Sequence, residues 1–316
     1  MDGLQIVGVG RACFDVLIRL RDLPTWEHGT RFCALSIDGG GPVGTACVAA
    51  ARLGARVGFV GTAGNDEFAE SKLRFIARDG VDLRHVVVRD DIECDLVLAW
   101  VHEDSGERVF SHFERFGDSP LRPEELDRSY ITSAEYLLLD GAHEDAAVQA
   151  ARWMREAGKR VMLDAWTIPG VDVHPKFRRL IPEVDILIAG SDLVPALTGK
   201  QDVWEAGRAA LDFGPRIVVQ THGAGGSYTV TADEEFHTPA FSVPVVDTTG
   251  AGDVFHGAYL VGLLRGWDLR RVATFATAVS GIKCTRMGGR AGIPRYPDVV
   301  AFLRERGVEI EPGTMP

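Results

Sequence analysis

Several features that mark whole classes of protein are scarce or missing in this sequence. The 316 residues include only five cysteines, and no two of them are spaced as Cys-x-x-Cys, so we expect neither a disulfide framework nor a zinc site. Buried thiols in a reducing compartment are the simpler interpretation. No stretch approaches the roughly 18 consecutive apolar residues of a membrane span, and the first residues lack the basic segment and cleavage site of a secretory signal. These absences predict a cytoplasmic protein.

Positive charge is also in short supply. Lysine and arginine number 34 against 45 aspartates and glutamates, so the formal net charge is −11. A chain of this charge has no broad basic surface that could neutralise nucleic-acid phosphates or anionic lipids. We therefore expect no nucleic-acid or membrane partner, and we expect chemistry on a small molecule instead.

Apolar residues, by contrast, make up 46% of the chain, which is enough for a large core. Short β-rich runs alternate with helical stretches along most of its length. The strand-like runs are residues 4–10, 56–61, 136–141, 161–165, 185–190 and 216–221, and the helical stretches are 44–55, 145–158 and 203–214. This alternation predicts an α/β fold in which helices cover both faces of a mostly parallel sheet.

Two segments break the alternation. Residues 13–37 and 92–116 have the composition of antiparallel strands, and the second turns at Asp104-Ser105-Gly106. Together they predict a small β-sheet that projects from the main domain. The remaining segments, 1–12, 38–91 and 117–316, would then form the α/β core.

A glycine turn between an apolar strand-like run and an apolar helix-like run is the most informative stretch. It reads VVDTTGAGDVFHG at residues 245–257, and we expect the helix to begin near Asp253, with Gly250, Ala251 and Gly252 at its first turn. Backbone N–H groups there lack intrahelical partners and the helix dipole is positive, so the turn suits an anion. The same dipoles would hold Asp253 ionised and ready to accept a hydroxyl proton. This pairing suits phosphoryl transfer, and an ordinary helix cap is the alternative.

The longer pattern resembles a known family. DTTGAGDVFHGA resembles the C-terminal signature of the PfkB/ribokinase family of carbohydrate kinases, and residues 38–66 resemble its N-terminal signature, with matching order and spacing from about residue 4 to residue 303. The resemblance implies a ribokinase-like three-layer α/β/α fold with a small β-sheet lid that supports a homodimer. It also implies ATP-dependent phosphorylation of a sugar hydroxyl with Mg2+. Asp253 would be the general base, and the backbone of 250–252 would be the anion hole.

On the sugar side the resemblance touches four residues. Asp15 follows the first strand, where the family keeps an aspartate that binds sugar hydroxyls, as a carboxylate can. Gly40 and Gly41 would let the backbone approach the sugar closely. Thr45 stands where relatives usually carry asparagine, so the sugar would be different or differently held. An exposed lid carboxylate and a plain glycine loop are the alternatives.

On the nucleotide side, Thr221, Gly223 and Gly226 match the family's T-x-G-x-x-G loop and would line the ATP phosphates. A simple hairpin turn explains this pattern about as well. Asp247 and Thr249 occupy positions that in many relatives help bind a monovalent cation such as K+ beside the anion hole. Capping of the turn is the alternative for both residues.

Two departures and one further likeness bear on the substrate. The Asn-x-x-Glu pair that organises water around magnesium in relatives is replaced by Gly190 and Leu193, and Asp192 is the nearest carboxylate. Residues 283–294 resemble the ketose-kinase branch that includes sulfofructose kinase, which implies the primary hydroxyl of a ketose or related sugar, and Arg290 could touch a phosphate. The cations of sulfosugar-binding relatives are not evident, so a charged substrate stays open.

The sequence leaves three alternatives to a sugar kinase. A nucleoside kinase of the same fold differs only in its acceptor. A sugar or nucleotide sensor without efficient turnover would fit the missing Asn-x-x-Glu and the threonine at position 45. A dinucleotide-dependent oxidoreductase is suggested by VGVGRA at residues 7–12, but Cys13 stands where the third glycine of that motif belongs.

Overall fold

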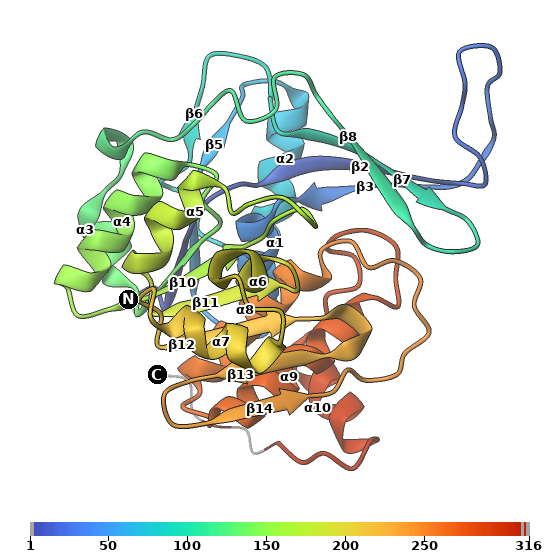
Figure 1. Cartoon of the computed structure of the whole chain (residues 1–316). Coiled ribbons are helices and arrows are strands. Elements are labelled where there is room, and N and C mark those ends of the chain that lie inside the picture. The colour runs from blue at the N-terminus through green and yellow to red at the C-terminus, as the bar shows by residue number, and fades with distance from the viewer. Residues whose placement is uncertain (1–2, 311–312, 314–316) are drawn as a thin grey trace.

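The computed structural model describes residues 3–310 and 313 and is dominated by a sheet of eight strands (Figure 1). The strand order is β14-β13-β12-β11-β10-β9-β1-β4, and all pairs from β4 to β12 are parallel, whereas β13 and β14 pair in antiparallel fashion. The strands are β1 (Ile6–Val9), β4 (Val57–Val60), β9 (Tyr136–Leu139), β10 (Arg160–Ala165), β11 (Ile186–Gly190), β12 (Ile217–Thr221), β13 (Ser227–Val230) and β14 (Glu235–Thr238).

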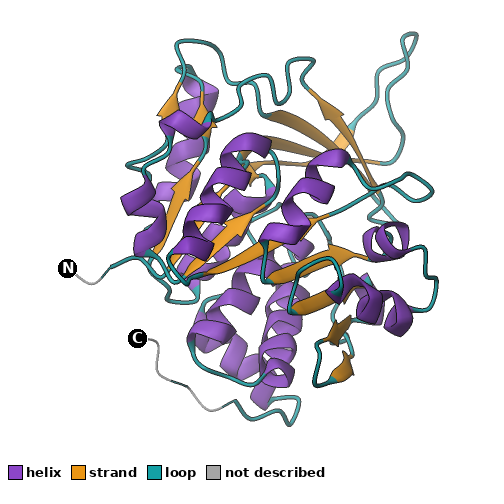
Figure 2. Ribbon diagram, turned by 60° about the vertical axis from the view of Figure 1, so that its left-hand side comes forward, coloured by secondary structure: helices purple, strands orange, loops and turns teal. Residues whose placement is uncertain are grey.

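Helices cover both faces of this sheet (Figure 2). Successive residues of a strand point to opposite faces, so Leu138 packs with one layer and Leu137 and Leu139 pack with the other. The first layer contains α1 (Pro42–Arg52), α8 (Ala251–Leu264), α9 (Leu269–Lys283) and α10 (Tyr296–Arg304). The second contains α3 (Arg128–Ser133), α4 (Glu144–Glu156), α5 (Pro175–Leu180), α6 (Leu193–Thr198) and α7 (Val203–Leu211). The predicted three-layer α/β/α class is confirmed.

Short polar signals set the ends of several helices. Asp66, Asp202 and Asp268 each accept a hydrogen bond from a backbone N–H in the first turn of α2 (Glu67–Ala77), α7 and α9, as good N-caps do. The described residues also form three single-turn 3-10 helices, at Pro123–Glu125, Ile181–Glu183 and Gly223–Gly225. A small two-stranded sheet consists of β5 (Thr62–Ala63) and β6 (Val87–Val88). None of the helices within the described residues has both the length and the apolar character that a membrane span requires.

A second sheet of four strands projects from the core, as Figure 1 shows. Its order is β3-β2-β7-β8, with β2 (Cys13–Leu20), β3 (Phe32–Gly40), β7 (Leu96–His102) and β8 (Arg108–His112). The strands fall within the two segments predicted for the lid except that β3 continues to Gly40, because residues 38–40 still pair with residues 13–15. We call this sheet the lid. The division of the chain into an α/β core and a separate lid stays a prediction.

The register gives the lid two unlike faces, because residues paired across a sheet point to the same side. Asp15 pairs with Asp38 and Val97 on one face, which is buried. The opposite face carries two rows of mostly apolar side chains that cross all four strands. These rows are Ile37, Val16, Leu98 and Ser111, and Leu35, Ile18, Trp100 and Val109.

Candidate active site

The turn before α8 offers uncapped backbone groups. Gly250 has φ 75°, in the left-handed region, and a Cβ there would lie 2.9 Å from the Gly289 carbonyl oxygen, so glycine is required on both grounds. A Cβ on Gly252 would meet nothing within 4 Å, so open space lies beside it. Ser280 Oγ donates to the carbonyl oxygen of Ala251 at 2.8 Å and ties the turn to α9. No side chain caps α8, and the N–H of Ala251 donates to the carbonyl oxygen of Thr248 at 3.1 Å, so the N–H groups of Gly252 and Asp253 are the ones left for an anion.

Asp253 lies in this first turn and is half-buried. Burial raises the pKa of its carboxyl, while the positive charges of His256, Lys283 and Arg290 act in the opposite direction. Desolvation thus acts against the helix dipole that was expected to hold Asp253 ionised. A carboxylate with a raised pKa is a stronger base, which suits proton abstraction from a hydroxyl.

A cavity of about 540 Å3 opens at this turn. Its walls come from the turn itself, from the loop after β12 and from α9. Thr221, Gly223 and Gly226 line it together with Ala251 and Gly252. The structure thus brings the proposed nucleotide loop and the proposed anion hole to one cavity, although they lie far apart in the sequence.

Asp15 is 7% exposed, so it is not the exposed lid carboxylate that the sequence left as an alternative. A Cβ on Gly40 would lie 1.9 Å from its Oδ2, and its Oδ1 is buried without a hydrogen-bond partner. Burial raises the pKa of Asp15 to about 7; Arg290 opposes this shift, whereas the charges of Asp38 and Asp253 add to it. Asp15 and Asp253 therefore influence each other across one polar region.

Thr45, in the first turn of α1, contacts the buried side chain of Arg290. Gly41 caps that helix with φ 82°, and both Thr45 and Arg290 are fully buried. Nε of Arg290 donates to Thr45 Oγ1 at 3.2 Å, and Nη2 donates to the Gly40 carbonyl at 2.5 Å. Its backbone N–H donates to Asp38. Arg290 therefore supports the sugar-side glycines from behind, which differs from the phosphate contact considered from sequence.

His256 and Asp164 form a buried pair that the sequence did not single out. His256 Nε2 lies 3.4 Å from Asp164 Oδ1, and its Nδ1 lies 2.7 Å from the Gly252 carbonyl oxygen. Burial raises the pKa of Asp164 to about 7, with His256 opposing and Asp253 adding to the shift. Two signals were available: Asp164 lies near the end of a predicted parallel strand, and His256 follows Asp253 by three residues on the same helix face.

Two cationic side chains, Arg11 and Lys176, lie at the same edge of the sheet, and the sequence did not single them out either. The backbone N–H of Arg11 donates to Asp140 Oδ2 at 2.8 Å, and its Nε lies 3.1 Å from Asp95 Oδ1. The Lys176 ammonium lies 5.7 Å from the centre of the Trp166 ring and has no carboxylate within ion-pair distance among the described residues. Burial lowers the pKa of Lys176, while Asp140 opposes that shift.

Hydrogen bonds hold both the carboxylate and the carbonyl oxygen of Asp247. Its Oδ1 accepts from the N–H of Thr249 and its Oδ2 from the N–H of Gly288, both at 2.8 Å. The ammonium of Lys283 donates to its carbonyl oxygen at 3.0 Å. Although burial alone would raise the pKa of Asp247, the charge of Lys283 and these hydrogen bonds lower it. Asp247 and Thr249 are thus neighbours, as the sequence suggested.

Two other polar side chains near the strand ends, His143 and Asp192, have ordinary structural partners. The ring of His143 is buried between the Gly10 carbonyl, at 3.2 Å, and the Leu121 N–H, at 3.1 Å, and burial lowers its pKa to about 4. Asp192 precedes α6 and accepts from Ser191 Oγ at 3.2 Å. In the part of the chain that is described, no three His, Cys, Asp or Glu side chains are grouped as metal ligands.

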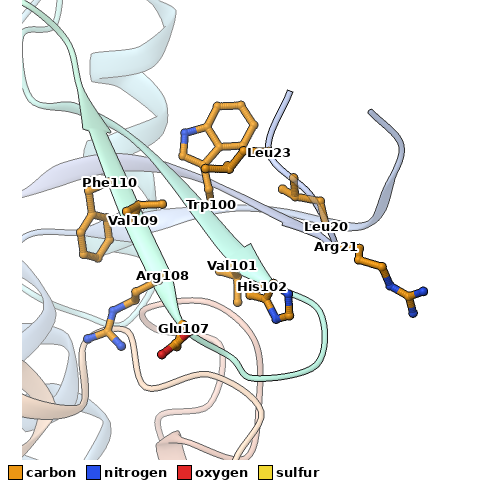
Figure 3. Close-up of a pocket in the computed structure, with 10 residues that line it drawn as sticks. All are labelled: Leu20, Arg21, Leu23, Trp100, Val101, His102, Glu107, Arg108, Val109 and Phe110. Atoms are coloured by element: carbon orange, nitrogen blue, oxygen red, sulfur yellow. The ribbon is translucent and has the colours of Figure 1, made fainter. Parts of the chain in front are cut away.

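The lid reaches the nucleotide side through one arginine. A groove of about 640 Å3 lies at the outer end of the lid. Figure 3 shows the side chains that line it, with Trp100 toward the top and Arg108 toward the lower left. The Arg108 guanidinium donates to the hydroxyl of Thr248, which lines the nucleotide cavity. Arg115, a second arginine beyond β8, is paired with Asp91 at 2.5 Å.

Known proteins are similar to this chain in sequence and in fold. Residues 6–295 match the pfkB family carbohydrate kinase. The chain is 27% identical to a 5-dehydro-2-deoxygluconokinase of Shouchella clausii over 96% of this chain and 97% of that protein. It is 32% identical to an aminoimidazole riboside kinase of Salmonella typhimurium over 82% and 85%. A ribokinase of Arabidopsis thaliana, solved with ribose and ATP, has a TM-score of 0.82 at 22% identity and covers 96% and 99%.

The fold and these likenesses define a phosphotransferase with a hydroxyl group as acceptor. The chain belongs to the pfkB family of carbohydrate kinases.

Proposed function

We propose that the protein transfers the γ-phosphoryl group of ATP to a hydroxyl of a sugar or sugar acid, with Asp253 as general base. The observation that carries this proposal is the position of Asp253. It follows directly on Gly252, which lines the nucleotide cavity, and its charge acts on Asp15 on the sugar side. Asp253 would remove the hydroxyl proton while the free N–H groups of the 250–252 turn stabilise the charge on the transferred group, the N–H of Ala251 being bonded to Thr248.

ATP would bind in the 540 Å3 cavity with its phosphates near Thr221, Gly223 and Gly226. Mg2+ would arrive on the ATP phosphates, whose charge it neutralises. This agrees with the absence of a grouped set of metal ligands in the described residues. All five cysteines carry free thiols, which supports a reducing location such as the cytoplasm.

The acceptor would lie against Asp15, Gly40 and Gly41, with its hydroxyls bonded to the unpartnered oxygen of Asp15. Thr45, expected from the sequence to bind the sugar, is fully buried and would act through Arg290 instead. Lys176 carries a positive charge near Asp140 and Asp164 without an ion-pair partner in the described residues. A carboxylate or phosphate on the sugar could pair with it. We therefore propose ketoses, related sugar acids and phosphosugars as the first acceptors to test, with the primary hydroxyl as the site of transfer.

The experiment measures ADP release from Mg-ATP against ketoses, aldoses, sugar acids, phosphosugars, sulfosugars and nucleosides. Asp253→Asn should lower kcat at least about a hundredfold for every acceptor that the wild type uses. ATP binding should be kept, because the backbone of the turn is unchanged. Asp233→Asn, at an exposed loop position, is the matched control and should behave as wild type. Turnover by Asp253→Asn within a few-fold of wild type would refute the assigned base.

We further propose that the lid joins two copies of this chain. Its outer face carries two apolar rows, in which Leu35, Ile37 and Val109 are each 53% exposed. Exposed apolar surface of this extent favours association. A second copy offers the same surface, and a two-fold axis through it would bury the rows of both lids against each other.

A further inference from the structure

Lys283 is one of the most completely buried charged residues of the molecule. It is the last residue of α9 and has no exposed surface. Its ammonium donates to the carbonyl oxygen of Asp247 at 3.0 Å. Among the described residues, no carboxylate lies within ion-pair distance of it. A buried ammonium that binds a backbone carbonyl instead of a carboxylate calls for an explanation, because its desolvation is costly.

The segment around Asp247 is closed onto the end of α9 and the loop after it. The N–H groups of Val246 and Asp247 both donate to the carbonyl oxygen of Cys284, at 2.8 and 3.2 Å. The side chain of Asp247 accepts from Gly288, and Gly250 lies against Gly289. The ammonium of Lys283 thus lies among hydrogen-bonded backbone segments that lead directly into the anion-hole turn.

This is the place where the sequence predicted a monovalent cation. A hard cation such as K+ needs several carbonyl and carboxylate oxygens directed at one point. Here the carbonyl oxygen of Asp247 accepts from Lys283, and both carboxylate oxygens accept from backbone N–H groups. Each of these oxygens keeps a lone pair, and Thr249 Oγ1 is buried without a hydrogen-bond partner among the described residues. The Lys283 ammonium, however, already places a positive charge beside them, which repels a second cation, so the site does not fit K+ as it stands.

We propose that the ammonium of Lys283 takes the place of the monovalent cation, as a built-in positive charge that positions the anion-hole turn. An ammonium carries the same unit charge and donates to oxygens where a metal ion would accept from them. Because it is covalently attached, this charge is present in every molecule at any K+ concentration. The enzyme is therefore independent of K+. In its kinetic form this inference rests on the proposed kinase activity, whereas its structural form does not.

Lys283 is a positioning residue, since the proposed phosphate would contact the N–H groups of the turn and not the ammonium. Its charge nevertheless acts on Asp253 through the buried region between them. Removing it should therefore affect kcat more than the KM of the sugar.

The kinetic test compares KCl with tetramethylammonium chloride at constant ionic strength. Wild-type kcat should be the same in both salts. Lys283→Ala should lose roughly tenfold in kcat without K+, less than the loss of a direct oxyanion donor causes. K+ or NH4+ should restore most of that loss, because the vacated space can hold the ion. Activation of the wild type several-fold by K+ would overturn the proposal.

Lys72→Met is the matched control, because Lys72 is the other lysine with no exposed surface and is paired with Glu93 at 2.5 Å. Its loss should lower the thermal midpoint without making activity or stability respond to K+. The thermal midpoint of Lys283→Ala should instead rise selectively with K+, which a purely structural role of Lys283 would not produce.

A second test needs no activity. Crystals of wild type and of Lys283→Ala are soaked in thallium(I), which has the charge and nearly the radius of K+ and scatters X-rays strongly. We expect no thallium beside Asp247 in the wild type and a bound ion at its carbonyl oxygen in Lys283→Ala. Thallium beside Asp247 in the wild type, or none in a well-folded Lys283→Ala, would refute the inference. Failure of the kinase assay alone would refute the proposed function and leave this result standing.

Discussion

The wall where we propose that the nucleotide binds is made of backbone segments that hydrogen-bond to one another, whereas the lid on the proposed sugar side is a sheet with one buried and one exposed face. On the nucleotide wall, Asp247, Gly288 and Ser280 fix the turn by hydrogen bonds of 2.8 Å. On the lid, Leu35 and Ile37 are half-exposed. The wall that would perform the phosphoryl transfer is preorganised, as electrostatic stabilisation of a transition state requires. The outer face of the lid, by contrast, carries mostly apolar side chains that are left partly open to solvent.

The largest effect should come from filling the preorganised wall. In Gly252→Ala the new methyl group would meet no protein atom within 4 Å and would project into open space at the cavity. We expect about a hundredfold loss of kcat because the transferred phosphate is displaced from its donors. The thermal midpoint should be unchanged or slightly higher, since alanine favours the helix.

Gly250→Ala is the contrasting variant. Its φ of 75° and the 2.9 Å approach to the Gly289 oxygen make any side chain strained. This variant should lose both activity and stability, the latter by about 1–2 kcal/mol. Calorimetry with steady-state kinetics separates the two cases. If Gly252→Ala keeps wild-type kcat, the anion hole is not where we place it.

The sugar side should respond in KM instead of kcat. A Cβ at position 40 would lie 1.9 Å from Asp15 Oδ2, so Gly40→Ala must push that carboxylate out of place. Losing hydrogen bonds from a charged acceptor costs about 1.5–3 kcal/mol. We expect the sugar KM to rise at least about tenfold, with the KM of ATP unchanged. Equal increases in both KM values would show that the two walls are not independent.

Much of the fold could be predicted because its signals are local. The apolar runs predicted at 136–141 and 161–165 became β9 and β10, and the helix expected near Asp253 begins at Ala251. The end of β3 was placed three residues early. Residues 38–40 look like a glycine loop, and only their pairing with β2 makes them a strand.

The candidate site divides in the same way. Gly250, Gly252 and Asp253 belong to one continuous motif, so the sequence alone indicates their place. Arg290 and Thr45, by contrast, bond across 245 positions, and Arg11 bonds Asp140 across 129. A buried polar contact between distant segments leaves no local pattern, because each partner alone looks like a surface residue. The same holds for Lys283, which lies 36 positions from Asp247.

The exposed face of the lid offers a smaller and separate effect. Ile37→Asp places a charge at the β3 end of an apolar row, so the proposed dimer should dissociate. Sedimentation or light scattering should report a monomer, with kcat falling no more than about threefold because the cleft is on the other face. Val88→Asp is the control, since Val88 is 58% exposed but lies outside the lid. A wild type that is monomeric at all concentrations would remove the proposed interface.

The smallest effect concerns the pH dependence of stability. Burial raises the pKa of Asp15 and Asp164 to about 7, from an ordinary value of 3.8. Between these values the folded state binds protons that the unfolded state has released, so the free energy of unfolding falls as pH rises from 4 to 7 and stays low above it. Asp164→Asn removes one of these groups while keeping an oxygen for His256.

We therefore expect Asp164→Asn to be more stable than wild type at pH 8 by about 1 kcal/mol or more, and the two proteins to converge near pH 4. Urea unfolding of both proteins across this range measures the difference directly. The sign matters: a carboxylate stabilised by its neighbours would make the variant weaker at pH 8 and equal to wild type only in acid. That outcome would mean that the charge of His256 outweighs burial, and that the floor of the cleft is preorganised for an ionised Asp164 in the way its nucleotide wall is for phosphate.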